Sequence, residues 1–231
     1  MPQYYGYDNN GGFMTRLFGN IPEVTRNLFL INVLMFIATL INENFMVSTF
    51  AVFYPASPFF RFWQPVTYMF MHGNFMHIFV NMWGLLMFGS ALERAIGSRK
   101  YLLFFFVTGL GALLIHFGVQ FLQVHSMMAA GAAAQQSYYK LLGIPTLGAS
   151  GALYGIQIGY AMLYPDVKWT LVFPPVTLKA KWFVLIFIGI ELYTGVTGTL
   201  DGVAHFAHLG GALFGFLMIF YWRKTGRLWR R

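Results

Sequence analysis

The sequence predicts an all-α, polytopic membrane protein with six transmembrane helices, and three observations support this. Hydrophobic residues make up 58% of the 231 residues and charged residues only 10%, whereas soluble domains average about 45–50% and about 25%. Several stretches long enough to cross a bilayer contain no charged side chain. The basic residues gather between alternate stretches. The chain has no cysteine, which excludes disulfides and thiol catalysis.

The charge-poor stretches define the expected spans, because a spanning helix needs about 17–25 mostly apolar residues. They are expected near residues 26–45, 67–90, 100–123, 148–165, 182–198 and 203–222. The fifth span is interrupted by one acidic residue, Glu191. The uncharged stretch 101–139 continues beyond the third span, but its second half is polar, with Gln120, Gln123, His125, Gln135, Gln136 and Ser137. We therefore expect an outer loop with a short Ala-rich helix at about residues 125–146, and not a seventh span.

The basic residues indicate the orientation of the chain. With the N-terminus inside, 13 of the 15 Lys and Arg residues lie in inner segments, and only Arg61 and Lys140 lie outside. We expect a multi-pass protein of the cell (inner) membrane with both termini cytoplasmic. Its parts would be a tail over 1–24, a membrane domain over 25–222 and a basic tail over 223–231. The net charge is +8, and this placement of the basic residues indicates that they face the lipid headgroups of the bilayer and do not bind nucleic acid.

Ser150 is the candidate nucleophile, since polar groups within spans usually mark function. It lies near the start of the fourth span, where unsatisfied helix N–H groups suit an oxyanion. Tyr154 follows at i+4 on the same face. A set of glycines at helical spacing predicts that this helix is central and closely packed: Gly148, Gly151, Gly155 and Gly159. Alternatively, the glycines and Ser150 form only a packing motif, with the hydroxyl bonded to its own helix.

His208 in the sixth span is the candidate base. It lies on the face of a Gly-x-x-x-Gly pair, Gly211 and Gly215, which would let this helix approach the glycine face of the fourth. That approach would bring His208 to Ser150, the pairing that a serine nucleophile requires. A packing role for His208 is the alternative. His205 is interpreted as an interfacial residue near Asp201.

His77 and Asn81 in the second span share a helical face at i and i+4, and both can donate to a developing oxyanion. A zinc site is not expected, because there is no His-Glu-x-x-His motif and no third ligand stands out. No cofactor is expected either.

Three motifs together resemble the rhomboid intramembrane serine proteases over about residues 25–222: His77-x-x-x-Asn81, Gly148-x-Ser150-Gly151 and Ala207-His208-x-x-Gly211-x-x-x-Gly215. The resemblance implies a six-helix rhomboid-like bundle with a short central fourth helix. It implies that Ser150 is the nucleophile and His208 the general base, and that His77, Asn81 and the Ser150 N–H hold the oxyanion. It also implies that Tyr154 packs against the imidazole of His208.

Two further pairs match the family pattern. Trp63-Gln64 stands where the family has a Trp-Arg pair in its first outer loop, so Gln replaces Arg here. Glu93-Arg94, at the inner end of the second span, fits as a structural ion pair or cap.

No carboxylate is expected beside His208, because Asp201 is near the surface and Glu191 is on another helix at mid-depth. We therefore expect a Ser–His dyad, not a triad. Glu191 should be protonated or hydrogen-bonded to an unidentified neighbour.

The leading hypothesis is an intramembrane serine endopeptidase that cleaves transmembrane protein substrates through an acyl-enzyme. The alternative is a catalytically silent rhomboid-like protein that binds membrane helices. A small transporter or channel is a third and weaker reading, because the inner half of the spans offers few polar groups beyond Gln157 and Tyr160.

Overall fold

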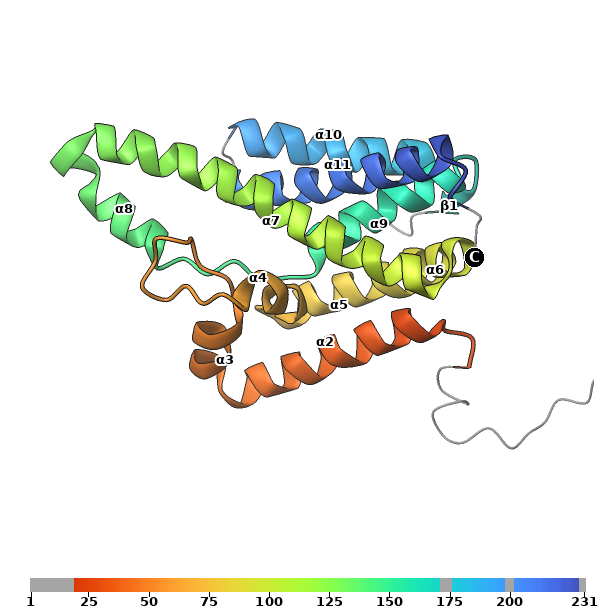
Figure 1. Ribbon diagram of the computed structural model, residues 1–231, viewed down its shortest axis with the longest axis horizontal. Helices are drawn as coiled ribbons and strands as arrows, with labels where there is room; N and C mark the ends of the chain where they lie inside the picture. Colours follow the sequence, from red (N-terminus) through yellow and green to blue (C-terminus); the bar gives the residue numbers. More distant parts are fainter. Residues whose placement is uncertain (1–18, 171–175, 198–201, 229–231) are drawn as a thin grey trace, which may run out of the picture.

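The computed structural model describes residues 19–170, 176–197 and 202–228, and most of them form an antiparallel helical bundle (Figure 1). Within these ranges, five helices are long and apolar enough to cross a membrane. The second of them, Phe75–Ile96, consists of α5 (Phe75–Gly84), a π-helical turn η2 (Leu85–Gly89) and α6 (Ser90–Ile96). The other four are α2 (Glu23–Ile41), α7 (Ser98–Ala129), α10 (Ala180–Thr197) and α11 (Gly202–Lys224, of which His205–Lys224 is the candidate span).

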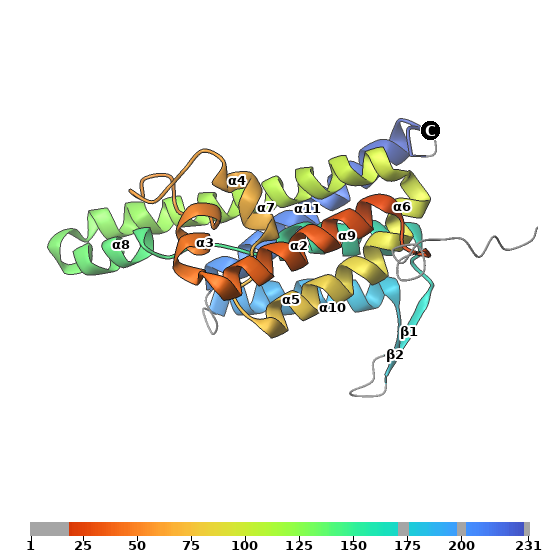
Figure 2. The same cartoon turned by 90° about the horizontal axis from the view of Figure 1, so that it is seen from below.

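The predicted fourth span is the short helix α9 (Ser150–Leu163). Its 14 residues extend about 21 Å, less than the roughly 30 Å of a hydrocarbon core. It contacts α7, α10, α11 and η2, so other helices surround it (Figure 2). The predicted short central fourth helix is therefore confirmed, while five helices of the described residues have the length and composition of a full span, so the predicted number of six is not confirmed.

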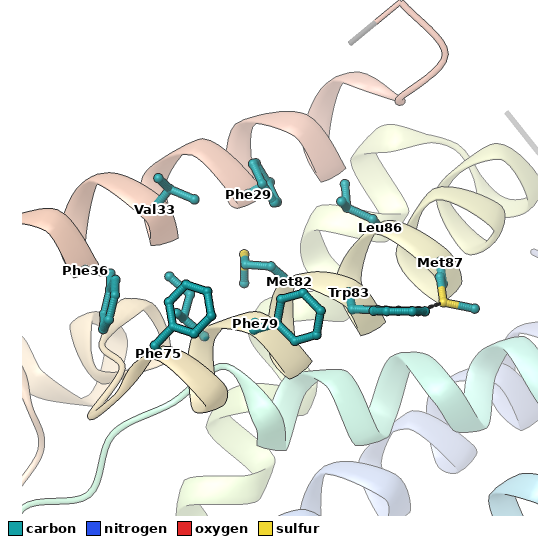
Figure 3. A pocket seen from close by; sticks show the side chains of 10 residues that line it. Phe29, Val33, Phe36, Phe75, Phe79, Met82, Trp83, Leu86 and Met87 are labelled. Atoms are coloured by element: carbon teal, nitrogen blue, oxygen red, sulfur yellow. Dashed lines mark hydrogen bonds between the residues drawn. The ribbon is translucent and has the colours of Figure 1, made fainter. Parts of the chain in front are cut away.

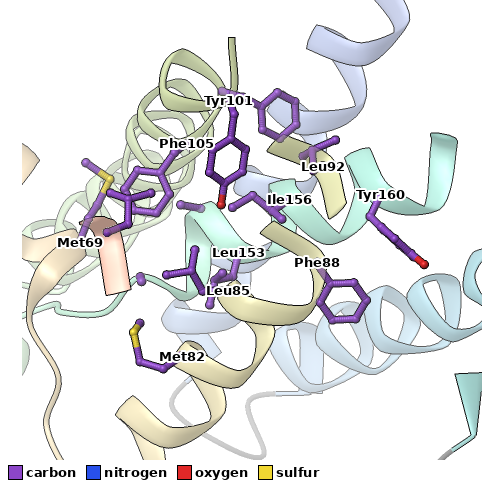
Figure 4. Close-up of a cluster of buried hydrophobic side chains, with 14 of the residues drawn as sticks. Met69, Met82, Leu85, Phe88, Leu92, Tyr101, Phe105, Leu153, Ile156 and Tyr160 are labelled. Atoms are coloured by element: carbon purple, nitrogen blue, oxygen red, sulfur yellow. The ribbon is translucent and has the colours of Figure 1, made fainter. Parts of the chain in front are cut away.

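Apolar side chains from α9 form the middle of the core. Leu153 and Ile156 lie among side chains of the second and third spans (Figure 4). Within a bilayer the alternative environment is lipid, which is as apolar as these side chains, so close van der Waals packing stabilises their contacts. The neighbours include Leu85, Phe88, Leu92, Tyr101 and Phe105.

The two ends of the bundle differ. At one, which we call the loop end, lie α3 (Glu43–Phe50), α4 (Gln64–Thr67), η1 (Tyr68–Phe70), η3 (Gly131–Ala134) and α8 (Gln135–Leu142). Helix α7 continues to Ala129, six residues beyond the predicted end of the third span and into the range 125–146, where a loop with one short helix was predicted; η3 and α8 follow it. The other is the hairpin end, where β1 (Lys168–Thr170) pairs antiparallel with β2 (Thr177–Lys179).

The chain ends of the described part pack on the hairpin end. Helix α2 begins at Glu23, within the predicted tail 1–24, and residues 1–18 lie outside the described ranges. Lys100 Nζ donates to the carbonyl of Arg227 at 2.6 Å, and Leu228 is buried. The start of the predicted basic tail 223–231 is therefore part of the folded bundle; residues 229–231 are not described.

An open apolar groove of about 550 Å³ lies between α2 and α5 (Figure 3). Aromatic, aliphatic and methionine side chains line it, among them Phe29, Phe36, Phe79 and Trp83. The Trp83 indole donates to the sulfur of Met87. This lining suits acyl chains or apolar side chains and offers no acid, base or nucleophile.

Candidate active site

Ser150 is the first residue of α9, and the turn before it depends on glycine. Gly148 has φ of +131°, which L side chains rarely adopt. A Cβ atom there would lie 2.8 Å from His77 Nε2, so the imidazole also requires the absence of a side chain. Gly148 thus lies before the helix and sets the direction in which the chain enters it. Our expectation that it belongs to the glycine face of the helix is wrong.

The remaining glycines bring α9 and α11 into backbone contact. A Cβ on Gly211 would overlap the carbonyl oxygen of Gly151, and a Cβ on Gly215 would lie 2.6 Å from that of Gly155. Only glycine permits this approach. As a result His208 Nε2 lies 2.8 Å from Ser150 Oγ, within hydrogen-bond distance.

Tyr154 and Glu191 hold the other sides of the imidazole. The Tyr154 ring stacks on that of His208, with centroids 4.5 Å apart and planes 9° apart. Glu191 Oε2 on α10 lies 3.1 Å from His208 Nδ1, although that nitrogen has no aligned hydrogen bond within the described residues. The expectation that no carboxylate lies beside His208 is therefore wrong.

Glu191 is buried among groups that can ionise. Its Oε1 accepts a hydrogen bond from the Tyr154 hydroxyl, and its Oε2 lies 2.5 Å from His205 Nδ1. His205 thus faces Glu191, whereas its predicted neighbour Asp201 lies outside the described ranges.

Residue depth could have revealed the Glu191 contact. Glu191 lies six residues before the end of α10, and His208 six residues after the start of α11. The two helices are antiparallel neighbours, so both side chains lie about 9 Å below the loop end.

His77 and Asn81 face the same site from α5. The Asn74 side chain caps this helix by accepting from the His77 backbone N–H at 2.8 Å. A long contact of 3.5 Å from Gly73 N to His77 Nδ1 favours a proton on Nε2, the nitrogen that lies beside Gly148. Asn81 Nδ2 is buried and has no partner in the described part of the chain, so it is free to donate.

These side chains line one cavity of about 510 Å³ between α5, α9 and α10. His77, Asn81, Ser150, Tyr154 and His208 all contribute to its wall. A carbonyl placed in it would have a nucleophile, a base and oxyanion donors within reach, which are the parts of an acyl-transfer site.

Trp63 and Gln64 lie outside this cavity and organise the loop after α3. Gln64 is fully buried; its amide donates to the carbonyl of Phe59 at 3.0 Å and accepts from Arg61 N at 3.0 Å. The Trp63 indole donates to the carbonyl of Thr49 at 2.8 Å. Gln64 is therefore an uncharged centre of hydrogen bonds in this loop.

A comparison with known protein families identifies the family of this chain. Residues 59–225 match the family model described as the Rhomboid domain. The chain belongs to the rhomboid family. The match includes every residue of the cavity named above.

Individual rhomboid relatives are distant. The chain is 27% identical over 158 residues to Rhomboid protease AarA of Providencia stuartii, covering 68% of this chain and 54% of the relative. It is 30% identical over 159 residues to RHOMBOID-like protein 1 of Arabidopsis thaliana, covering 68% and 34%. With Rhomboid-like protein 11, chloroplastic, of that plant it shares 25% over 203 residues, covering 85% and 64%. The matched region is thus about a third to two thirds of these relatives.

The rhomboid site also contains a possible ligand set that the sequence analysis did not find. Glu191, His205 and His208 each offer one ligand atom, and these atoms lie within 4.8 Å of one another. The missing third ligand, on which the argument against zinc depended, is therefore Glu191.

Proposed function

We propose that this rhomboid is an intramembrane serine endopeptidase that cleaves transmembrane protein substrates through an acyl-enzyme. The observation that carries the proposal is the 2.8 Å contact between Ser150 Oγ and His208 Nε2 in the wall of the cavity. The relative from Providencia stuartii, named a rhomboid protease, is consistent with it.

In the first half-reaction, His208 Nε2 takes the proton of Ser150 as Oγ bonds to the scissile carbonyl carbon. The carbonyl electron pair moves to oxygen, and His77 Nε2–H, Asn81 Nδ2–H and the Ser150 N–H at the start of α9 donate to it. The imidazolium returns its proton to the leaving amine as the C–N bond breaks, which leaves an ester on Ser150. Water repeats these steps on the ester and releases the acid.

Glu191 assists His208 in this scheme. When Nε2 accepts from Ser150, the neutral ring carries its proton on Nδ1, 3.1 Å from Glu191 Oε2. The carboxylate therefore favours the productive tautomer and stabilises the imidazolium, as the third member of a triad does. The contact lacks hydrogen-bond alignment, so the assistance should be weaker than in an aligned triad.

The loop end would face outward and the hairpin end the cytoplasm, which is the cell-membrane orientation that the basic residues favour. The nucleophile then lies near the outer surface at the start of α9, and water enters from that side. Substrates would be cut near the outer end of a helix that unwinds easily, with small residues at the cut.

The test is cleavage of single-span substrates by purified protein in liposomes. Ser150→Ala and His208→Ala should each abolish cleavage, while Ser126→Ala, an exposed serine of α7, should leave it intact. A fluorophosphonate should label wild type and not Ser150→Ala. Full cleavage by Ser150→Ala contradicts the mechanism; a folded protein with neither labelling nor cleavage favours the silent helix-binding alternative.

A further inference from the structure

Beside the nucleophile, α10 and α11 bring together the donor atoms of a metal site. His205 and His208 are one helical turn apart on α11, and both turn Nδ1 toward Glu191 Oε2 on α10. Two imidazole nitrogens and one carboxylate oxygen are the ligands of many zinc sites that keep a fourth position open. The three atoms lie within 4.8 Å of one another.

The spacing is close to that of a zinc site. Bonds of about 2.0–2.2 Å in tetrahedral geometry place ligand atoms about 3.3–3.6 Å apart. The 3.1 Å between His208 Nδ1 and Glu191 Oε2 is slightly shorter than this, and the 2.5 Å to His205 Nδ1 must widen by about 1 Å. The three side chains remain 11–21% exposed, so an ion can reach them.

The His208 nitrogen is also available. Nδ1 has no aligned hydrogen bond within the described ranges, so a metal would not displace one there. The ring is held in place by stacking on Tyr154, which presents the Nδ1 lone pair in a fixed direction once its proton has left.

We propose that Glu191, His205 and His208 form a reversible site for a borderline divalent cation, best fitted by Zn²⁺, and that its occupation inhibits the enzyme. The inhibitory half of this inference rests on the proposed function, whereas the binding half does not. It concerns the same imidazole that faces Ser150 through its other nitrogen.

Inhibition follows from the tautomer. Zn²⁺ on Nδ1 uses the lone pair of that nitrogen, so the single ring proton of neutral His208 moves to Nε2. An Nε2–H can donate to Ser150 Oγ but cannot take its proton, and the general base is lost. Glu191 is occupied at the same time and no longer stabilises the imidazolium. Ca²⁺ and Mg²⁺ should not inhibit in this way, because they require mostly oxygen ligands and Glu191, His205 and His208 together offer only one carboxylate.

The binding arm of the test uses the full chain in detergent with Ser150→Ala, which keeps all three ligands and has no activity to measure. Titration of Zn²⁺ against a chromophoric chelator should give one site per chain. Adding His205→Ala, or His205→Gln should the alanine variant unfold, should weaken binding at least 10-fold. The matched control is His125→Ala, which removes an exposed histidine of α7 and should leave binding unchanged.

The activity arm uses the wild-type protein in liposomes with Zn²⁺ and then EDTA. Cleavage should fall at the zinc concentration that fills the site, recover with EDTA and be insensitive to Ca²⁺. His205→Ala should need at least 10-fold more Zn²⁺, relative to its own zinc-free rate. No zinc binding by Ser150→Ala, or an equal effect of the His205 and His125 substitutions, overturns the site. Binding without any wild-type cleavage overturns the proposed function alone.

Discussion

Glu93 and Glu191 are both buried carboxylates, yet their surroundings differ. At the hairpin end, Glu93 is 2% exposed and accepts from Val24 N at 3.0 Å, Thr25 N at 2.7 Å, Thr25 Oγ1 at 2.7 Å and Ser98 Oγ at 2.7 Å. Near the loop end, the carboxylate of Glu191 contacts Tyr154, His205 and His208. The donors of Glu93 keep their protons, whereas those of Glu191 can lose or gain them.

This difference indicates two roles for one residue type. Glu93 accepts the free N–H groups at the start of α2 and ties that helix to α6 and α7, which is a structural cap. The predicted role of Glu93 as a structural cap thus fits its contacts, while Arg94 instead donates to the carbonyl of Asn20. Glu191 contacts His208, the general base of the proposed mechanism, so in that mechanism its charge affects the chemistry.

Replacing Glu93 should have the largest effect, and that effect should be on stability. Glu93→Gln removes the charge and places an amide among donors, which should lower the free energy of unfolding by about 2–3 kcal/mol. Denaturation in mixed micelles measures this, with Glu23→Gln, an exposed residue of the same helix start, as the control. An unchanged unfolding midpoint with lost activity would reverse the assigned role.

Replacing Glu191 should instead lower activity. Glu191→Gln should reduce kcat/KM for a transmembrane substrate about 10–100-fold, less than the roughly 10⁴-fold loss from an aligned triad carboxylate. The rate of fluorophosphonate labelling should fall in parallel, and Glu43→Gln, an exposed residue of α3, should change neither. Wild-type kinetics in Glu191→Gln would show that the 3.1 Å contact is incidental.

A smaller effect is expected at Tyr154. Tyr154→Phe keeps the ring stacked on His208 and removes only the hydrogen bond to Glu191. A hydrogen bond to a charged group contributes about 1.5–3 kcal/mol to stability, but this bond is already present in the free enzyme, so kcat/KM should fall no more than about fivefold. A loss as large as that of Glu191→Gln would mean that the hydroxyl takes part in the chemistry.

The smallest effect is expected at an exposed carboxylate. Asp166 lies 3.0 Å from both Lys179 Nζ and Lys181 Nζ, and hydrogen bonds from these lysines lower the pKa of its carboxyl. Its contribution to stability is therefore present at neutral pH and disappears as the pH falls through this lowered pKa. Asp166→Asn should leave cleavage unchanged and shift the thermal midpoint slightly at pH 7 but not in strong acid. A difference that persists in acid would contradict this.

Features that depend on residues close together in the sequence could be predicted, whereas contacts between distant segments could not. Gly211 and Gly215 repeat at helical spacing, and so do Gly151 and Gly155, so helix geometry alone predicted two surfaces that approach closely. Gly148 has the same spacing but lies in the preceding turn with positive φ. Gly148 is outside the glycine face of the helix because α9 begins only at Ser150, and glycine spacing does not indicate where a helix begins.

Composition and charge placement by themselves determined a helical membrane bundle, and glycine spacing indicated a central fourth helix that the sixth can approach closely, because each depends on patterns within one segment. The shortness of the fourth helix was an expectation from the family resemblance. Only the tertiary structure decided that Glu191 joins Ser150 and His208 and that Gln64 centres the loop after α3. Both contacts depend on the rotation and depth of separate segments, which packing of the whole bundle sets and no local pattern encodes.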